Sequence, residues 1–167
     1  MNSLDEKFNT GMVAFASQNY GVCIENLTEV LKKDTTHKLA LVTRGAAFMR
    51  TGETATAMTD FDSALEIDPD YARAYHLRGL AREAKGDDEG ALADFGRAIE
   101  LKPDYAAAYY SRATLYTKQG QMGLADEDSR MTTHLTEYNI QTLANENNIW
   151  RSDHMAVEDM METELNR

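Results

Sequence analysis

The sequence repeats itself every 34 residues, and this period constrains the fold more than any other feature of the chain. The Asp-Pro-Asp-Tyr segment around Pro69 returns as Lys-Pro-Asp-Tyr around Pro103, one period later. A fixed period of roughly 20 to 50 residues is the signature of stacked units that bury their apolar faces against each other. We therefore expect an array of similar units. The same step joins Gly52, Gly86 and Gly120, then Ala57, Ala91 and Ala125, and then Arg44, Arg78 and Arg112.

Four copies of the repeat fit into the chain. A weaker first copy precedes the clear ones, because Gly11 lies one period before Gly45, and Cys23 one period before Ala57. The copies at the two ends are expected to diverge, since terminal repeats face solvent on one side. The copies span residues 4–37, 38–71, 72–105 and 106–139, and residues 140–167 follow as a C-terminal segment.

Each copy is predicted to be a helical hairpin. In the third copy, two stretches rich in helix-forming residues run from Ala72 to Lys85 and from Asp88 to Leu101. Gly86 and Asp87 separate them, and Pro103 follows the second stretch and ends it. Apolar residues recur at intervals of three and four, as on the buried stripe of a helix. The expected fold class is therefore all-α, an array of four helix-turn-helix units with a C-terminal helix.

Composition excludes several classes of function. The chain has 17 Lys and Arg against 28 Asp and Glu, a formal charge of −11, so no nucleic-acid partner is expected. No apolar run approaches the roughly 18 residues of a membrane-spanning helix, and no membrane insertion is expected. The single cysteine, Cys23, forms no intramolecular disulfide, and the first residues lack the pattern of a secretory signal. These features indicate a cytoplasmic protein.

An acid follows each of three repeated arginines by 16 residues, an interval that leads from the first helix of a hairpin to the second. The recurrence predicts ion pairs between the two helices rather than an anion-binding ladder, because a partly buried Arg without its acid is costly. In the first copy both charges are replaced, by Thr10 and Asn26. The predicted pairs are Arg44 with Asp60, Arg78 with Asp94, and Arg112 with Asp128.

The third copy resembles the unit of the tetratricopeptide repeat family, a 34-residue helix-turn-helix with aromatic, small and proline residues at set offsets. The resemblance covers about four fifths of the chain. It implies a right-handed superhelical array whose first helices line a concave surface that receives a peptide or a helix. The chain departs from the family pattern in its outer copies and at Arg82, where a second aromatic residue is expected. The matching residues are Tyr75, Gly79, Ala91, Phe95, Ala98 and Pro103.

The resemblance also places candidate binding residues on the concave surface. Most of them are apolar or aromatic, which favours binding to the apolar side of a partner segment, with Met side chains making adaptable contacts. In the alternative interpretation, individual members of the set pack between neighbouring hairpins. The candidates are Phe8, Met12, Leu39, Val42, Thr43, Met49, Arg73, His76, Leu77, Leu80, Tyr110 and Ser111.

One branch of the family, the heat-shock cochaperones, holds the terminal carboxylate of its ligand with five polar or basic residues. The matching places here are Phe8, Met12, Thr43, Arg73 and Leu77, of which only Arg73 is basic. A carboxylate among such side chains would lose its hydration without gaining enough hydrogen-bond donors. We therefore expect that this chain does not bind a terminal carboxylate in that way.

The C-terminal segment, residues 140–167, continues the helical pattern with an apolar seam that includes Leu143 and Trp150. Two interpretations are open. In the first, the segment is a capping helix that shields the fourth hairpin. In the second, its Met-rich acidic end after Ser152 docks into the groove of its own or another chain, which produces autoinhibition or a homo-oligomer.

The sequence contains no catalytic or cofactor motif. The four histidines are scattered, and His154 with Glu158 is a lone i, i+4 pair, too few ligands for a metal site. We expect a non-enzymatic module, without cofactor or metal, that acts as an adaptor for a protein or peptide partner. The alternatives are a self-assembling scaffold joined by its C-terminal helix and a secretion-type chaperone. The chaperone would require an added segment before the first hairpin, which Met1 to Ser3 do not supply.

Overall fold

The computed structural model describes residues 3–146. Within this range the chain forms eight α-helices and no strand, and consecutive helices pair into four hairpins. The predicted all-α array of helical hairpins is confirmed. The hairpins are α1 (Ser3–Ala16) with α2 (Tyr20–Lys33), α3 (Lys38–Thr51) with α4 (Thr54–Ile67), α5 (Ala72–Ala84) with α6 (Asp88–Leu101), and α7 (Ala106–Lys118) with α8 (Met122–Glu146).

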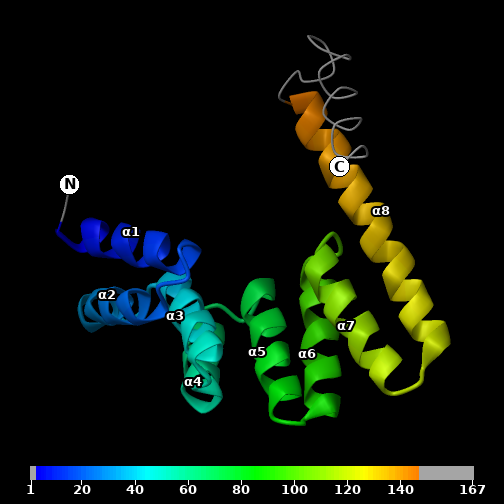
Figure 1. The fold of residues 1–167 in the computed structure, drawn as a ribbon, viewed down its shortest axis with the longest axis horizontal. Coiled ribbons are helices and arrows are strands. Elements are labelled where there is room, and N and C mark those ends of the chain that lie inside the picture. The colour runs from blue at the N-terminus through cyan, green and yellow to red at the C-terminus, as the bar shows by residue number, and fades with distance from the viewer. Residues whose placement is uncertain (1–2, 147–167) are drawn as a thin grey trace, which may run out of the picture.

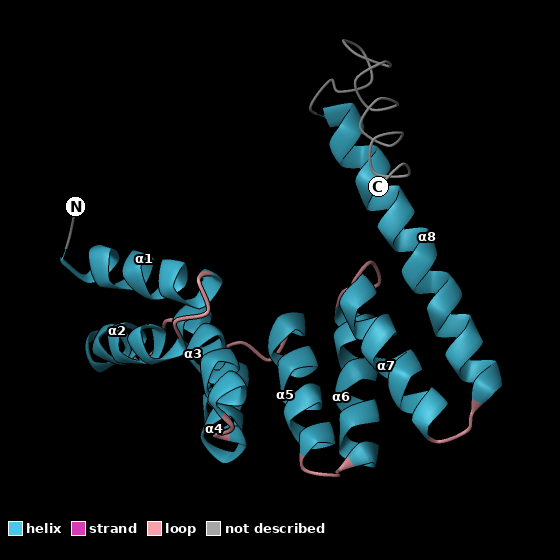
Figure 2. Cartoon of the chain, viewed as in Figure 1, coloured by secondary structure: helices cyan, strands magenta, loops and turns pink. Residues whose placement is uncertain are grey.

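The hairpins stack side by side in one curved row that begins at α1 and ends at α8 (Figures 1 and 2). Each helix packs against its neighbours in the chain, and the first helices also touch each other: α1 contacts α3, α3 contacts α5, and α5 contacts α7. Among the described residues, no such contact joins α2, α4, α6 and α8 to each other. The more closely spaced layer of a curved stack is its inner layer. The concave side, which we call the first-helix face, is therefore formed by α1, α3, α5 and α7.

Close contact within a hairpin depends on a glycine in the first helix. A Cβ atom placed on Gly45 would lie 2.6 Å from Cε1 of Phe61, and one on Gly79 would lie 2.5 Å from Cε1 of Phe95. Both phenylalanines are fully buried. A larger residue at either glycine would force the two helices apart, so the small residues of the repeat are needed for hairpin packing.

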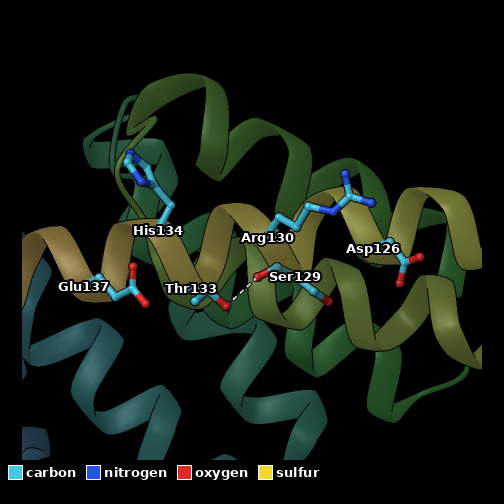
Figure 3. A pocket seen from close by; sticks show the side chains of 6 residues that line it. All are labelled: Asp126, Ser129, Arg130, Thr133, His134 and Glu137. Carbon is cyan, nitrogen blue, oxygen red and sulfur yellow. Dashed lines mark hydrogen bonds between the residues drawn. The ribbon is translucent and has the colours of Figure 1, made fainter.

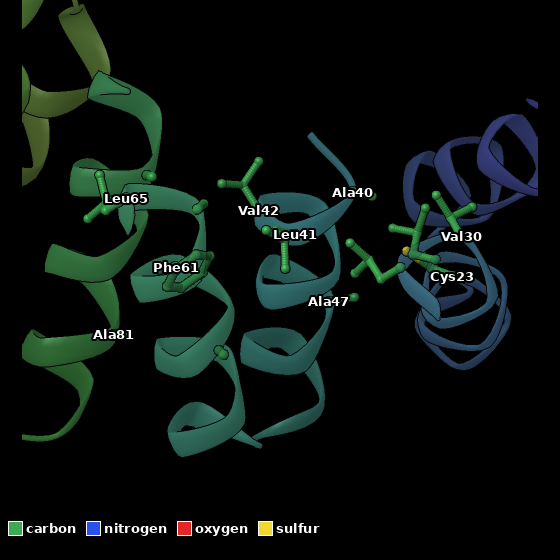
Figure 4. Packing of buried hydrophobic residues seen from close by; sticks show 14 of the residues in the cluster. Cys23, Val30, Ala40, Leu41, Val42, Ala47, Phe61, Leu65 and Ala81 are labelled. Carbon is green, nitrogen blue, oxygen red and sulfur yellow. The ribbon is translucent and has the colours of Figure 1, made fainter. Parts of the chain in front are cut away.

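The first three hairpins share one hydrophobic core, which extends from α1 to α5 and contains Phe61 and Leu41 (Figure 4). Cys23 of α2 belongs to this core and is fully buried. Burial raises the pKa of the Cys23 thiol above its ordinary value. Because the thiolate is the reactive form of cysteine, Cys23 acts as a packing residue.

The turns inside the hairpins use the left-handed backbone region. The turn glycines Gly52, Gly86 and Gly120 have φ angles of +88°, +81° and +75°. In the first hairpin the equivalent place, one period before Gly52, is occupied by Gln18, which has a φ of +60°. Residues that carry a Cβ atom rarely adopt this region. The first hairpin therefore keeps the turn geometry of the others at an energetic cost.

The last helix is longer than the repeat predicts. Pro69 and Pro103 follow the ends of α4 and α6, but Glu137 stands one period after Pro103 and does not stop a helix. As a result α8 runs without a break to Glu146. It projects past the end of α7 (Figure 1).

Residues 140–146 extend α8, so the helix runs on across residues 139 and 140, and the division of the chain at this point stays a prediction. The other predictions for the tail, which concern Trp150, Ser152, His154 and Glu158, lie outside the described residues. None of the described helices is long and apolar enough to cross a membrane.

Candidate functional site: the first-helix face

Three Arg–Asp pairs join the helices within the hairpins, as the 16-residue spacing predicts. In the second hairpin, Nε of Arg44 donates to Oδ2 of Asp60 at 2.9 Å and Nη2 donates to Oδ1 at 2.6 Å. This two-pronged geometry is the strongest form of an Arg–carboxylate contact. The same arrangement recurs between Arg78 and Asp94, at 2.9 and 2.8 Å, and between Arg112 and Asp128, at 2.7 and 2.8 Å.

Two of these arginines also reach the preceding hairpin. Nη1 of Arg44 donates to Oγ1 of Thr28 at 3.1 Å, and Nη1 of Arg78 donates to Oδ1 of Asp62 at 2.7 Å. Each of these side chains therefore connects two hairpins. The hydrogen bond to Asp94 raises the pKa of Arg78, so its charge is retained. These arginines serve the architecture and are not available to a ligand.

The accessible part of the first-helix face is mainly apolar. Leu39, Leu77 and Leu80 are partly exposed there, and Phe8 packs its ring against His37 with ring centroids 4.6 Å apart. Of the twelve candidates, eight keep some exposure: Phe8, Met12, Leu39, Met49, Arg73, Leu77, Leu80 and Tyr110.

The other four candidates are buried. Val42 and Thr43 have no exposed surface. His76 and Ser111 are 8% and 9% exposed and contact each other. A side chain covered by its own protein does not touch a ligand, so these four residues shape the face from beneath.

A buried polar cluster holds α5 against α7. Nε2 of His76 lies 2.9 Å from Oγ of Ser111, and Nδ1 lies 3.2 Å from the hydroxyl of Tyr105. Burial lowers the pKa of His76 to about 4, with a smaller contribution from the charge of Arg73. At neutral pH the imidazole is therefore uncharged, and its two nitrogens are both paired.

The repeat explains which candidates are buried. Val42, His76 and Tyr110 occupy the same place in successive hairpins, one period apart. Tyr105, at the start of the fourth hairpin, covers His76 with its ring centroid 5.1 Å away. Its counterpart Tyr71 packs against the core that contains Val42. No fifth hairpin follows Tyr110 in the described residues, and Tyr110 is 65% exposed.

The sequence interpretation missed two residues on this face. Tyr105 was not among the candidates. It lies one period after Tyr71, and this recurrence of a tyrosine is the signal that could have identified it. Arg50 is exposed at the end of α3 and donates from Nε to the hydroxyl of Tyr20 at 3.2 Å. Glu66 stands 16 residues after Arg50, but the two residues form no ion pair, so the 16-residue spacing does not identify Arg50 as an unpaired cation.

Two cavities lie away from the candidate binding residues. One of about 580 Å³ is lined by Asp126, Ser129, Arg130, Thr133, His134 and Glu137, all exposed side chains of α8 (Figure 3). Another, of about 320 Å³, is lined mainly by α2 and α4 and includes Arg44 and Asp60. Neither contains any of the candidate binding residues. Within the described residues, no group of three or more His, Cys, Asp or Glu side chains could hold a metal ion.

The polar surface of α8 marks the end of the array. Ser129 and Thr133 stand one period after Phe95 and Ile99, which are apolar. Both α8 residues are exposed, whereas Phe95 is fully buried. At these two places α8 therefore offers a following hairpin polar side chains where α6 offers apolar ones.

Comparison with known proteins identifies relatives for the middle of the chain. Residues 45–86 and 83–120 match the family described as TPR repeat. A Dictyostelium discoideum protein, DnaJ homolog subfamily C member 7 homolog, is 32% identical over 79 residues, which are 45% of this chain and 15% of that protein. The chain thus spans a small part of the length of this relative.

Two solved structures have the same arrangement of helices. MamA superposes with a TM-score of 0.73 at 23% identity, over 84% of this chain and 82% of MamA, a likeness that concerns the fold alone. The first TPR of Spaghetti (RPAP3), bound to the HSP90 peptide SRMEEVD, superposes with a TM-score of 0.66 at 25% identity. That match covers 70% of this chain and 93% of the other.

Proposed function

Because the chain belongs to the tetratricopeptide repeat family, we propose that it is a non-catalytic adaptor that binds a segment of a partner protein on the first-helix face. The observation that carries this proposal is the row of partly exposed apolar residues across successive first helices, from Leu39 and Met49 to Leu77 and Leu80. Such a row is suited to burying the apolar side of a peptide or helix. The proposed setting is the cytoplasm, where the buried Cys23 stays reduced.

Partner selection on this face differs from terminal-carboxylate recognition. In the places that correspond to carboxylate-binding residues of the cochaperones, this chain has a partly exposed Phe8, Met12 and Leu77, a buried Thr43, and only one cation, Arg73. We propose that affinity comes from apolar contact and that Arg73 selects a partner with a nearby acidic side chain.

The proposal is tested by capturing partners on immobilised protein from cell extract and identifying them by mass spectrometry. Tyr110→Glu places a charge on an exposed side chain of α7, and Leu77→Glu places one at the centre of the face. For both variants, the amount of specifically captured partner is expected to fall at least tenfold. Met122→Glu, at a side chain that is 56% exposed at the start of α8, is the matched control and is expected to bind normally. Equal capture by all three variants would reject the first-helix face as the binding site.

Self-assembly is a second candidate function, favoured by one observation on α8. Leu124, Met131 and Tyr138 are 44%, 39% and 61% exposed, and they recur at intervals of seven residues. This is the spacing by which two helices pack along a common seam. Sedimentation of wild type and of Met131→Glu at several concentrations tests it: a wild-type dimer that the variant loses supports self-assembly, and a wild-type monomer at all concentrations rejects it. The secretion-chaperone alternative remains a prediction.

A further inference from the structure

Charge is divided between the two layers of the array. The first helices of the last three hairpins are basic and the second helices are acidic, although the chain as a whole has a net charge of −11. The helices α3, α5 and α7 carry Lys38, Arg44, Arg50, Arg73, Arg78, Arg82, Arg112 and Lys118, and one acid, Glu83. The helices α4, α6 and α8 carry Asp60, Asp62, Glu66, Asp88, Glu89, Asp94, Glu100, Asp126, Glu127, Asp128, Glu137 and Glu146, and two bases, Arg97 and Arg130.

Of the eight basic side chains on α3, α5 and α7, six form an ion pair with a described carboxylate and two do not. Lys38 pairs with Asp68 at 2.6 Å, and Lys118 pairs with Asp88 at 3.1 Å. Within the described part of the chain, no carboxylate lies within ion-pair distance of Arg50 or Arg73, and both residues are exposed. They stand near opposite ends of the adjacent helices α3 and α5. Arg50 and Arg73 therefore present unpaired positive charge on α3 and α5, beside apolar side chains of the same helices.

The chain itself contains a segment of complementary chemistry. Residues 147–167 follow the last described residue, Glu146, and combine five acids with three methionines and two arginines, Arg151 and Arg167. As an extended chain of 21 residues the segment would reach about 70 Å, and as a helix about 31 Å, compared with about 37 Å for the whole of α8. In an extended conformation the segment is therefore longer than α8 and can run back along the whole of this helix. The acids are Asp153, Glu158, Asp159, Glu162 and Glu164, and the methionines are Met155, Met160 and Met161.

We propose that residues 147–167 dock on the first-helix face of their own chain, with carboxylates toward Arg73 and methionines against Leu77 and its neighbours. This inference rests on the proposed function, because it uses the same face, and it adds a regulator: a partner must displace the segment before it binds. Attachment to α8 gives the segment an effective concentration on the order of millimolar, which favours the same chain over a second copy in dilute solution.

A fluorescence experiment on the full chain tests the docking directly. The sequence contains one tryptophan, Trp150, and it lies in the proposed segment. We expect Trp150 emission to be shifted to short wavelength and protected from acrylamide in the wild type. Arg73→Glu should raise the quenching constant at least threefold, because it replaces attraction by repulsion. Arg97→Glu, which reverses the charge of an exposed arginine on α6 that is paired with Glu100 and Asp70, is the control and should leave the constant unchanged.

Reversing the charges on both sides of the proposed contact separates docking from general effects of substituting charged side chains. The double variant Glu158→Lys, Asp159→Lys should release Trp150 as Arg73→Glu does, and the two changes combined should restore at least half of the protection. Protection in the wild type should be independent of protein concentration while sedimentation shows a monomer. Free Trp150 in the wild type, no effect of Arg73→Glu, or protection that appears only in a dimer would each overturn the proposal.

A binding measurement distinguishes failure of this inference from failure of the proposed function. A synthetic peptide of residues 147–167 should bind the Glu158→Lys, Asp159→Lys protein at least tenfold more tightly than the wild type, whose own segment competes. Equal affinity for the two proteins overturns the docking in cis. The partner-capture experiment with Tyr110→Glu and Met122→Glu is independent of this peptide, and it still decides whether the first-helix face binds other proteins.

Discussion

Nε2 of His76 lies 2.9 Å from Oγ of Ser111, and this buried contact joins the first helices of the last two hairpins. The hydroxyl of Tyr105 occupies the other imidazole nitrogen, at 3.2 Å from Nδ1. The cluster lies directly beneath the exposed part of the first-helix face. Its protonation state therefore controls how firmly the two hairpins are held together.

Stability is expected to fall as the pH is lowered from about 6.5 to about 4. Burial lowers the pKa of His76 from 6.5 in the unfolded chain to about 4 in the folded chain. Between these pH values the unfolded state binds the additional proton, so the free energy of unfolding decreases with acidification. The contribution of His76 to stability is fully present above pH 6.5 and is lost as the pH falls to about 4. The loss attributable to His76 is at most about 3.5 kcal/mol.

Urea unfolding of the wild type and of His76→Gln at pH 4.5 and pH 7.5 measures this contribution. Carboxyl groups such as those of Asp34 and Asp68 have lowered pKa values and also weaken the fold in acid, so the difference between the two proteins is the informative quantity. The variant should show the smaller dependence on pH. Parallel pH profiles would contradict the assignment.

Removal of an ion-pair acid should destabilise the array without changing which partner is bound. Asp94→Ala leaves Arg78 and Arg82 without the carboxylate that lies 2.8 and 3.0 Å from them. The carboxylate is 4% exposed, and the expected loss is about 3 kcal/mol in the free energy of unfolding. Denaturant unfolding of Asp70→Ala is the control: its 78% exposed side chain contacts Arg97 at 3.5 Å, and its loss should be within about 0.5 kcal/mol. Similar losses in both variants, or altered partner selection in Asp94→Ala, would reject a purely structural role.

Replacing one buried hydroxyl is expected to stabilise the protein. Oγ1 of Thr43 is buried and has no hydrogen-bond partner. Thr43→Val keeps the shape of the side chain and removes the unpaired group, so the free energy of unfolding should rise by about 1 kcal/mol. Ser111→Ala is the opposite case, because it removes the partner of His76, and it should lower stability by about 1 kcal/mol. Thermal melts of the two variants should therefore move in opposite directions, and a lower melting temperature for Thr43→Val would contradict the prediction.

The first hairpin is expected to gain stability from a glycine in its turn. Gln18 has a φ of +60°, the region in which Gly52, Gly86 and Gly120 lie. Gln18→Gly removes the Cβ strain and should raise the free energy of unfolding by about 0.5 to 1 kcal/mol. Gly52→Ala imposes the same strain on the second hairpin and should lower stability by a similar amount. Both values follow from denaturant unfolding, and a destabilised Gln18→Gly would show that the glutamine side chain has another role.

Spacing alone was sufficient to predict the pairing of Arg44 with Asp60. Sixteen residues lead from one helix of a hairpin to the facing helix, and an Arg and an Asp recur at this interval and at the same place of three successive copies. The same argument covers the glycines that contact Phe61 and Phe95, because these contacts lie within single hairpins. The long α8 could also have been anticipated, since Glu137 replaces the repeated proline.

Burial of the candidate binding residues could not be predicted from the spacing of the repeat. Val42, His76 and Tyr110 share one place in the repeat, yet the first two are buried and the third is 65% exposed. Their surroundings come from the next hairpin, which a single unit of the pattern does not contain. Leu77, by contrast, stays partly exposed on the same helix as His76.

By itself, the amino-acid sequence determined the number of hairpins, their turns and the ion pairs within them, because these depend on residues that are near each other along the chain. Only the tertiary structure decided which residues of the concave layer remain accessible and where positive charge is left uncompensated. Both properties depend on the curvature of the stack and on contacts between hairpins, such as the contact of Tyr105 with His76 and that of Arg78 with Asp62.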